Sequence, residues 1–210
     1  MFAVGHMALA YLLGKPVAKL LKVNLNVPLL LVLSLIPDVD LLFGGFISHR
    51  GPTHSIVTAV LVFVPFFVVY RKKAIPYFLG LVSHAAVADF LVGGDLQLFW
   101  PLTNADFGLH ELGSYYIAIN SPVNVALELS LFVVATLVMF KAGDLRGFFQ
   151  NKKSNLILVV PIATVLLPSV VGYPLAVPVL LVLPHLFYLV LFGVSVLVVF
   201  FGFFKKKKDR

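Results

Sequence analysis

Acidic and imidazole side chains are concentrated between residues 38 and 55 of this 210-residue chain. The stretch begins with Pro37-Asp38-Val39-Asp40 and ends with Ser48-His49-Arg50-Gly51-Pro52-Thr53-His54-Ser55. Imidazole nitrogens and carboxylate oxygens together suit zinc or manganese, and several in one place suit a cluster of two or three ions. The chain has no cysteine, which excludes disulfides and thiolate sites. The stretch therefore predicts half of a divalent metal site, with zinc favoured and manganese or iron as alternatives.

The polar residues around Arg50 each have two interpretations. Arg50 is suited to bidentate pairing with a phosphate or carboxylate, and it is equally suited to a salt bridge with Asp38 or Asp40. Thr53 and Ser55 are expected to orient imidazoles or to cap the helix that follows.

The histidines also have structural interpretations when they are taken singly. His6 lies in an apolar segment, where a lone histidine is more often a packed residue than a ligand. His49 and His54 are compatible with ordinary loop positions, and Asp38 with a turn or cap after proline. Gly51-Pro52 predicts a turn that brings the two loop histidines together.

Composition places the chain in a membrane. It is 60% hydrophobic with a mean hydropathy of +1.04, and only 12% of its residues are charged. A soluble domain is about one quarter charged. The net charge of +7 is therefore interpreted as a marker of the cytoplasmic side, and no nucleic-acid partner is expected. The N-terminal segment does not have the pattern of a signal peptide.

Seven apolar segments predict an all-α, polytopic membrane helical bundle with about five to seven membrane helices. They cover residues 2–14, 25–36, 55–70, 75–92, 122–141, 155–171 and 175–204. A long polar and aromatic loop, residues 93–121, is expected to be functional, with Trp100, Tyr115 and Tyr116 at the membrane interface. We divide the chain into a metal-site half, 1–121, and C-terminal membrane-anchoring helices, 122–210.

Charge distribution predicts the orientation of this bundle. If the seven segments cross in order, alternate loops and the tail carry 15 of the 16 Lys and Arg residues, Arg50 being the exception. The positive-inside rule then places the C-terminus in the cytoplasm and the N-terminus outside. The outer face would hold one group of ionisable residues: His6, Asp38, Asp40, His49, His54, His84, Asp89, His110 and Glu111.

The spacing of His84 and Asp89 predicts an irregular helix. Residues five apart lie about 140° apart around an ideal α-helix and do not share a face. Asp89 therefore lies past the end of the helix, or the helix contains a π-type bulge, which is frequent at functional sites. The structural alternative is a carboxylate that caps or neutralises a local group.

These motifs resemble one known family, the YdjM-like, LexA-binding, inner-membrane-associated family of membrane-bound metal-dependent hydrolases. The matching residues cover about the first half of the chain: His6, Pro37-Asp38-Val39-Asp40, the run from His49 to Ser55, Gly80-Leu81-Val82-Ser83-His84, Asp89 and Phe99-Trp100-Pro101-Leu102. One departure is the spacing after His84, where the family has one residue fewer before the Asp. The family is distantly similar to zinc-dependent phospholipase C and related single-strand nucleases, which are all-α. The resemblance implies the metal ligands His6, Asp38, Asp40, His49, His54, His84 and Asp89.

The function predicted from these observations is a metal-dependent phosphoesterase that acts on a phospholipid or lipid-linked phosphate through a metal-activated water. Arg50 would offset charge on the phosphoryl oxygens, and Asp40 or Asp89 would serve as general base. A metal transporter is the first alternative, because Glu128 and His185 lie within later apolar segments. A non-catalytic membrane scaffold is the second, with anionic lipid as the expected contact of the basic loops.

Overall fold

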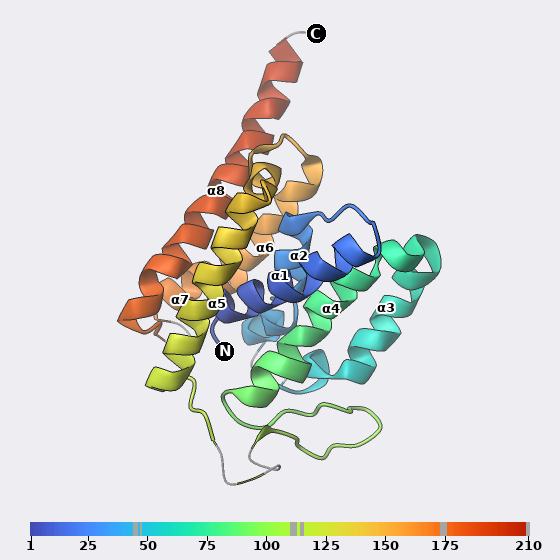
Figure 1. Cartoon of the computed structure of the whole chain (residues 1–210), viewed down its shortest axis with the longest axis vertical. Coiled ribbons are helices and arrows are strands. Elements are labelled where there is room, and N and C mark those ends of the chain that lie inside the picture. The colour runs from blue at the N-terminus through green and yellow to red at the C-terminus, as the bar shows by residue number, and fades with distance from the viewer. Residues whose placement is uncertain (44–45, 47, 110–112, 114–115, 173–175, 209–210) are drawn as a thin grey trace.

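A computed structural model describes residues 1–43, 46, 48–109, 113, 116–172 and 176–208 (Figure 1). Every named element within these ranges is helical, and the extended segments there meet in one isolated bridge between Leu96 and Phe107. The all-α prediction is therefore confirmed.

The helices differ in length and in type. The α-helices are α1 (Ala3–Leu20), α2 (Val27–Leu33), α3 (Ile56–Tyr70), α4 (Ile75–Ser83), α5 (Pro122–Lys141), α6 (Val159–Pro161), α7 (Leu167–Val170) and α8 (Val179–Lys208). The 3₁₀ segments are η1 (Pro37–Phe43), η2 (Pro52–His54), η3 (Arg71–Lys73), η6 (Asp144–Phe149) and η7 (Lys153–Leu158). Two segments are π-helical, η4 (His84–Asp89) and η8 (Ile162–Leu166).

Local sequence determines where three of these helices begin. The side chains of Asn26, Ser55 and Ser121 accept hydrogen bonds from the first free backbone N–H groups of α2, α3 and α5. Proline occupies the first or second position of α2 and α5, where its missing N–H removes no helical bond. The capping role expected for Ser55 is confirmed.

Helix α1 forms the centre of the molecule. It packs against α2, α4, α5 and α8, and it runs obliquely to α5 and α8 in Figure 1. Its side chains Val4, Met7 and Tyr11 are fully buried in one apolar cluster that also includes Tyr188 and Phe192 of α8. Helices of the C-terminal half therefore support the helix that carries His6.

Three helical stretches are long and apolar enough to cross a membrane. They are Pro122–Lys141, Lys153–Val170 and Val179–Gly202. Helix α3 is equally apolar but has 15 residues, and none of them is buried. The expected count of five to seven membrane helices, and the division at residue 121, stay predictions.

Candidate metal centre

Segments that are far apart in the sequence place seven His and Asp side chains around one point. His6 comes from α1, Asp38 and Asp40 from η1, His49 from the turn before η2, His54 from η2, and His84 and Asp89 from η4. Six of the seven are buried, and only the His49 side chain is substantially exposed, at 41%. The structure thus brings together every residue that the sequence indicated as a ligand.

The centre of the cluster is a pair of imidazoles. His54 Nε2 and His84 Nε2 are 3.2 Å apart. Asp38 Oδ1 lies 3.5 Å from the first nitrogen and 3.3 Å from the second. Asp89 Oδ2 lies 3.3 Å and 3.5 Å from the same two atoms.

These separations have the scale of a metal coordination shell. Zinc binds imidazole nitrogen and carboxylate oxygen at about 2.0–2.2 Å, so two donors on one tetrahedral ion are about 3.3–3.6 Å apart. The two imidazoles and either carboxylate therefore form a triangle whose edges fit one face of such a tetrahedron. Together these donors can hold a divalent ion.

Both imidazoles are held so that Nε2 points into the cluster. The Nδ1–H of His84 donates to the Ser34 carbonyl at 2.6 Å. The Nδ1 of His54 lies 3.0 Å from Thr53 Oγ1, which itself donates to Asp40 Oδ2 at 2.6 Å. Hydrogen bonds of this kind on the far nitrogen fix the tautomer and the ring orientation of metal-binding histidines. The orienting role expected for Thr53 is present in the structure.

Asp40 and His49 form the outer edge of the cluster. Asp40 Oδ1 lies 2.9 Å from His49 Nδ1, and its Oδ2 lies 3.4 Å from His54 Nδ1. The rings of the two histidines meet edge to face at 5.0 Å, as the turn at Gly51-Pro52 predicted. These three residues form a second group of donor atoms, all within 4.8 Å of one another.

His6 and Asp89 form the inner edge. The His6 ring stacks on His84 at 3.7 Å with an interplanar angle of 8°, and these residues and Asp89 make a third group of donors. His6 Nε2 donates to the Met1 carbonyl at 3.1 Å and lies 3.4 Å from Asp89 Oδ1. The His6 Nδ1 atom is buried, and among the described residues no hydrogen-bond partner faces it.

Electrostatics keeps the carboxylates charged. Burial alone would raise the pKa of Asp38, but the charge of His84 and hydrogen bonds from His54 and His84 hold it well below its ordinary value. Burial opposes the ionisation of His54 as well, yet its bonds to Asp38, Asp40 and Asp89 raise its pKa well above the ordinary value.

A π-helix explains how His84 and Asp89 reach the same point. Both residues lie in η4, where the wider turn brings positions five apart close to one face. Of the two arrangements that the spacing allowed, the structure has the π-type bulge, and Asp89 does not lie past the helix end. It places the Asp89 carboxylate within 3.5 Å of the imidazole of His84.

Arg50 forms its salt bridge with Asp89. The alternative of a salt bridge with Asp38 or Asp40 was therefore wrong. Its guanidinium lies 3.4 Å from Asp89 Oδ1 and donates to the carbonyls of Val92 and Gly94 at 2.9 Å and 2.7 Å. Both acceptors are backbone carbonyls, so the residue types in the sequence could not indicate them. Arg50 thus ties the loop after η4 to the cluster.

Glu128, in the candidate membrane span α5, accepts hydrogen bonds at the start of the helix that carries His6. Its Oε1 accepts from the Phe2 backbone N–H and the Asn124 amide, both at 2.8 Å, and its Oε2 accepts from the Gly5 N–H at 3.0 Å. A carboxylate that accepts from N–H groups of the first turn is a favourable partner for the start of a helix. The sequence marked Glu128 as unusual in an apolar segment without indicating that it caps α1.

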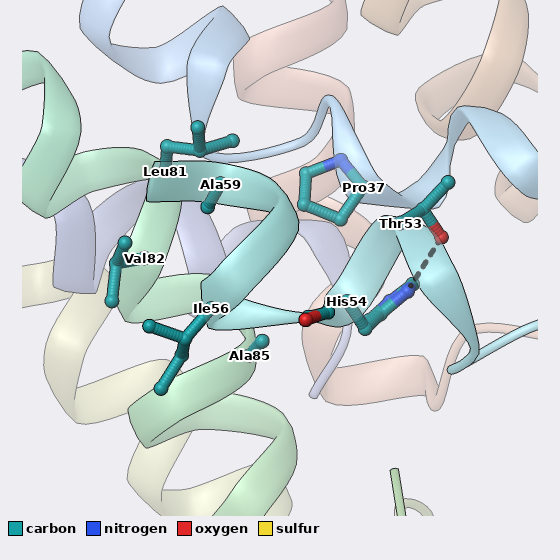
Figure 2. A pocket seen from close by; sticks show the side chains of 9 residues that line it. Pro37, Thr53, His54, Ile56, Ala59, Leu81, Val82 and Ala85 are labelled. Carbon is teal, nitrogen blue, oxygen red and sulfur yellow. Dashed lines mark hydrogen bonds between the residues drawn. The ribbon is translucent and has the colours of Figure 1, made fainter. Parts of the chain in front are cut away.

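A small cavity of about 10 Å³ lies beside His54. Figure 2 shows that its wall is mostly apolar, with Ile56, Leu81 and Val82 opposite the η2 residues Thr53 and His54. This space is about the size of one water molecule. The partly exposed His49 marks the edge of the cluster that is nearest to solvent.

Some of the expected outer-face residues cannot be placed. His110, Glu111 and Tyr115 lie outside the described residues. Trp100 is half-buried and Tyr116 is exposed, both in the loop that follows η4. His185 lies in α8, where its Nδ1–H donates to the Leu181 carbonyl of the same helix at 2.8 Å.

Comparison with known proteins identifies the family. The family model for the YdjM inner membrane protein matches residues 1–201. The chain therefore belongs to the YdjM inner membrane protein family, and it is a membrane protein with buried His and Asp groups able to hold a metal ion. No curated protein sequence and no solved structure matches the chain.

Proposed function

We propose that the chain is a membrane-bound, metal-dependent hydrolase that cleaves a phosphate ester of a phospholipid or lipid-linked phosphate. One observation carries the proposal. The pair of Nε2 atoms of His54 and His84, 3.2 Å apart, shares two carboxylates whose oxygens lie 3.3–3.5 Å from them. Ionisable residues in such number are costly in a membrane protein and mark functional sites.

The residues that would hold the metal are those whose donor atoms converge. The set is His6, Asp38, Asp40, His49, His54, His84 and Asp89, which form three groups of donors that share His54 and His84. We propose that this set holds two or three ions. Zinc fits the donors best, with manganese and iron as further candidates. A bound divalent ion would supply Lewis acidity and lower the pKa of water to about 7.

The residues around the donors hold them in place. Thr53 links Asp40 to the Nδ1 side of His54 and so keeps Nε2 directed at the centre. In the free protein Arg50 lies against the Asp89 carboxylate and holds it in place. We also propose that Arg50 offsets charge on a phosphoryl group of the substrate. Asp40 is proposed as the general base at the edge that a substrate would reach first.

The surroundings of the cluster support a lipid substrate. Helix α3 begins two residues after His54, and none of its residues is buried. Its apolar side chains include Leu61 and Val69, which are 63% and 70% exposed. Since a surface of this kind is stable against lipid, the cluster lies beside a face suited to lipid chains.

Metal content and phosphatase activity test the proposal together. The full chain would be purified in zwitterionic nanodiscs, its metal content measured by mass spectrometry, and release of phosphate from added phosphatidate followed. We expect two or more ions per chain. His54→Ala and His84→Ala should lose both metal and activity, while His185→Ala, a buried histidine outside the cluster, should keep both.

Other outcomes would favour the other functions. One loosely bound ion with uptake of metal into proteoliposomes would indicate a transporter. A chain that binds no zinc, manganese or iron would contradict the hydrolase and leave a scaffold. Metal retained with no hydrolysis of phosphatidate or other phosphate esters would contradict the proposed reaction alone.

The proposed orientation has the N-terminus and the metal cluster outside and the C-terminus in the cytoplasm, as the charge distribution predicts. Figure 1 places the C-terminal end of α8 and the loop after η4 at opposite ends of the molecule. An epitope tag after residue 210 should be inaccessible to antibody in intact cells. A tag that is labelled from outside would overturn this orientation.

A further inference from the structure

A second cavity, of about 270 Å³, lies on the side of the molecule where α5 ends. It is lined by residues of two segments, 25–28 at the start of α2 and 143–152 after α5. These segments lie close together near the upper end of Figure 1. The cavity is separate from the metal cluster, since the two share no residue.

The charge of this cavity is positive. Arg146 and Lys152 line it, and within the described part of the chain neither forms an ion pair. The acidic residue in the lining, Asp144, is already neutralised, because Lys15 Nζ lies 2.6 Å from its Oδ2 and Tyr11 donates to the same carboxylate at 2.7 Å. Two cations therefore remain available to a ligand.

Neutral donors and an apolar floor complete the cavity. Asn26 uses its Oδ1 to cap α2, which leaves its amide N–H groups as donors. Val27 and Pro28 are buried below it. Gly147 lines the cavity without a side chain of its own, and a Cβ there would make an ordinary contact with Pro28 Cδ at 3.6 Å.

The position of the cavity relates it to the membrane surface. It lies between the end of one candidate span, at Lys141, and the start of the next, at Lys153. Basic pockets between membrane helices near the interface bind anionic headgroups. From this geometry we infer that the cavity binds a phosphate monoester, either the headgroup of an anionic lipid or a soluble phosphate ester.

Direct binding to the full chain in zwitterionic nanodiscs tests this inference. The probes are dioctanoyl phosphatidate, dioctanoyl phosphatidylcholine and glycerol 3-phosphate, titrated calorimetrically with metal absent. We expect saturable binding of phosphatidate and none of phosphatidylcholine. Equal affinity for glycerol 3-phosphate would identify a soluble ester as the ligand, and preference for phosphatidate would identify a lipid headgroup.

Variants locate the binding. Removing both cations with Arg146→Gln and Lys152→Gln should weaken binding about 25-fold, since each cation at a membrane surface contributes about fivefold. Gly147→Leu should abolish binding without a change in charge, provided that its melting temperature shows a folded chain. Lys19→Gln with Lys141→Gln removes two exposed cations outside the cavity and should leave binding unchanged.

Two results would overturn the inference. Equal losses in the two double variants would show diffuse attraction to the basic face instead of a defined site. No saturable binding of either phosphate ester to the wild-type chain would exclude the site altogether. Because none of these residues touches the metal cluster, either result leaves the proposed hydrolase unaffected.

Discussion

Glu128→Gln tests whether a membrane helix positions the metal cluster. In the wild-type chain Glu128 Oε1 accepts two hydrogen bonds, from the Phe2 N–H and the Asn124 amide, and Oε2 accepts one from the Gly5 N–H. A glutamine can keep its oxygen in the Oε1 position. Its NH₂ group then faces the Gly5 N–H at 3.0 Å, so that two donors oppose each other in a buried place.

The magnitude follows from this one lost bond. The Gly5 N–H keeps its bond to the Phe2 carbonyl at 3.0 Å, so the loss is that of one hydrogen bond to a charged acceptor, worth about 1.5–3 kcal/mol of stability. Gly5 precedes His6, so a shift at the start of α1 moves the imidazole that stacks on His84 at 3.7 Å. Loss of an outer partner of a metal ligand typically lowers affinity by about 10–100-fold, and we expect about tenfold here because Glu128 acts through the helix.

The assay is a competition titration of Zn²⁺ with a chromophoric chelator, combined with unfolding in increasing SDS. Glu128→Gln should be less stable and should bind the first ion about tenfold more weakly. Ser130→Ala is the matched control, because Ser130 lies in the same helix and its hydroxyl donates to the Ala126 carbonyl one turn earlier. Reduced stability together with wild-type Zn²⁺ affinity would refute the idea that Glu128 positions the cluster.

Three further predictions concern neighbouring groups. Gly5→Ala should reproduce the Glu128→Gln phenotype, because its Cβ would lie 2.8 Å from the Glu128 carboxylate; wild-type unfolding in SDS would contradict this. Thr53→Ala should lower Zn²⁺ affinity about tenfold in the same titration, since it removes the link between Asp40 and His54, and Thr53→Ser should restore it. Zn²⁺ affinity should rise with pH by up to about tenfold per unit until the raised pKa of His54 is passed, because the metal displaces its proton; a flat pH profile of the titration would oppose that reasoning.

The hydrophobic pattern of the sequence and the residues that start its helices determined much of the architecture. The segment expected at 122–141 matches α5 residue for residue, because Ser121 and Pro122 start the helix and an apolar run sustains it. The membrane class followed from the apolar composition. The all-α fold followed from the apolar segments, because the hydrophobic pattern of a segment is a local property of the sequence. The spacing of His84 and Asp89 predicted an irregular helix, and the structure decided between a helix end and the π-helix that it has.

The rarity of ionisable residues in so apolar a chain indicated a group of nine outer-face residues, and the resemblance to a known family reduced this group to seven candidate ligands. Only the tertiary structure decided which groups these residues contact. Three contacts depend on segments distant in the chain: the carboxylate that Arg50 meets, the carbonyl that orients His84, and the N–H group from which Glu128 accepts. Two of these three contacts involve backbone groups, which every residue carries and no sequence motif distinguishes. The opening stretch from residue 38 to 55 thus determines that a metal site is chemically possible, and the packing of α1, η4 and α5 around it determines its shape.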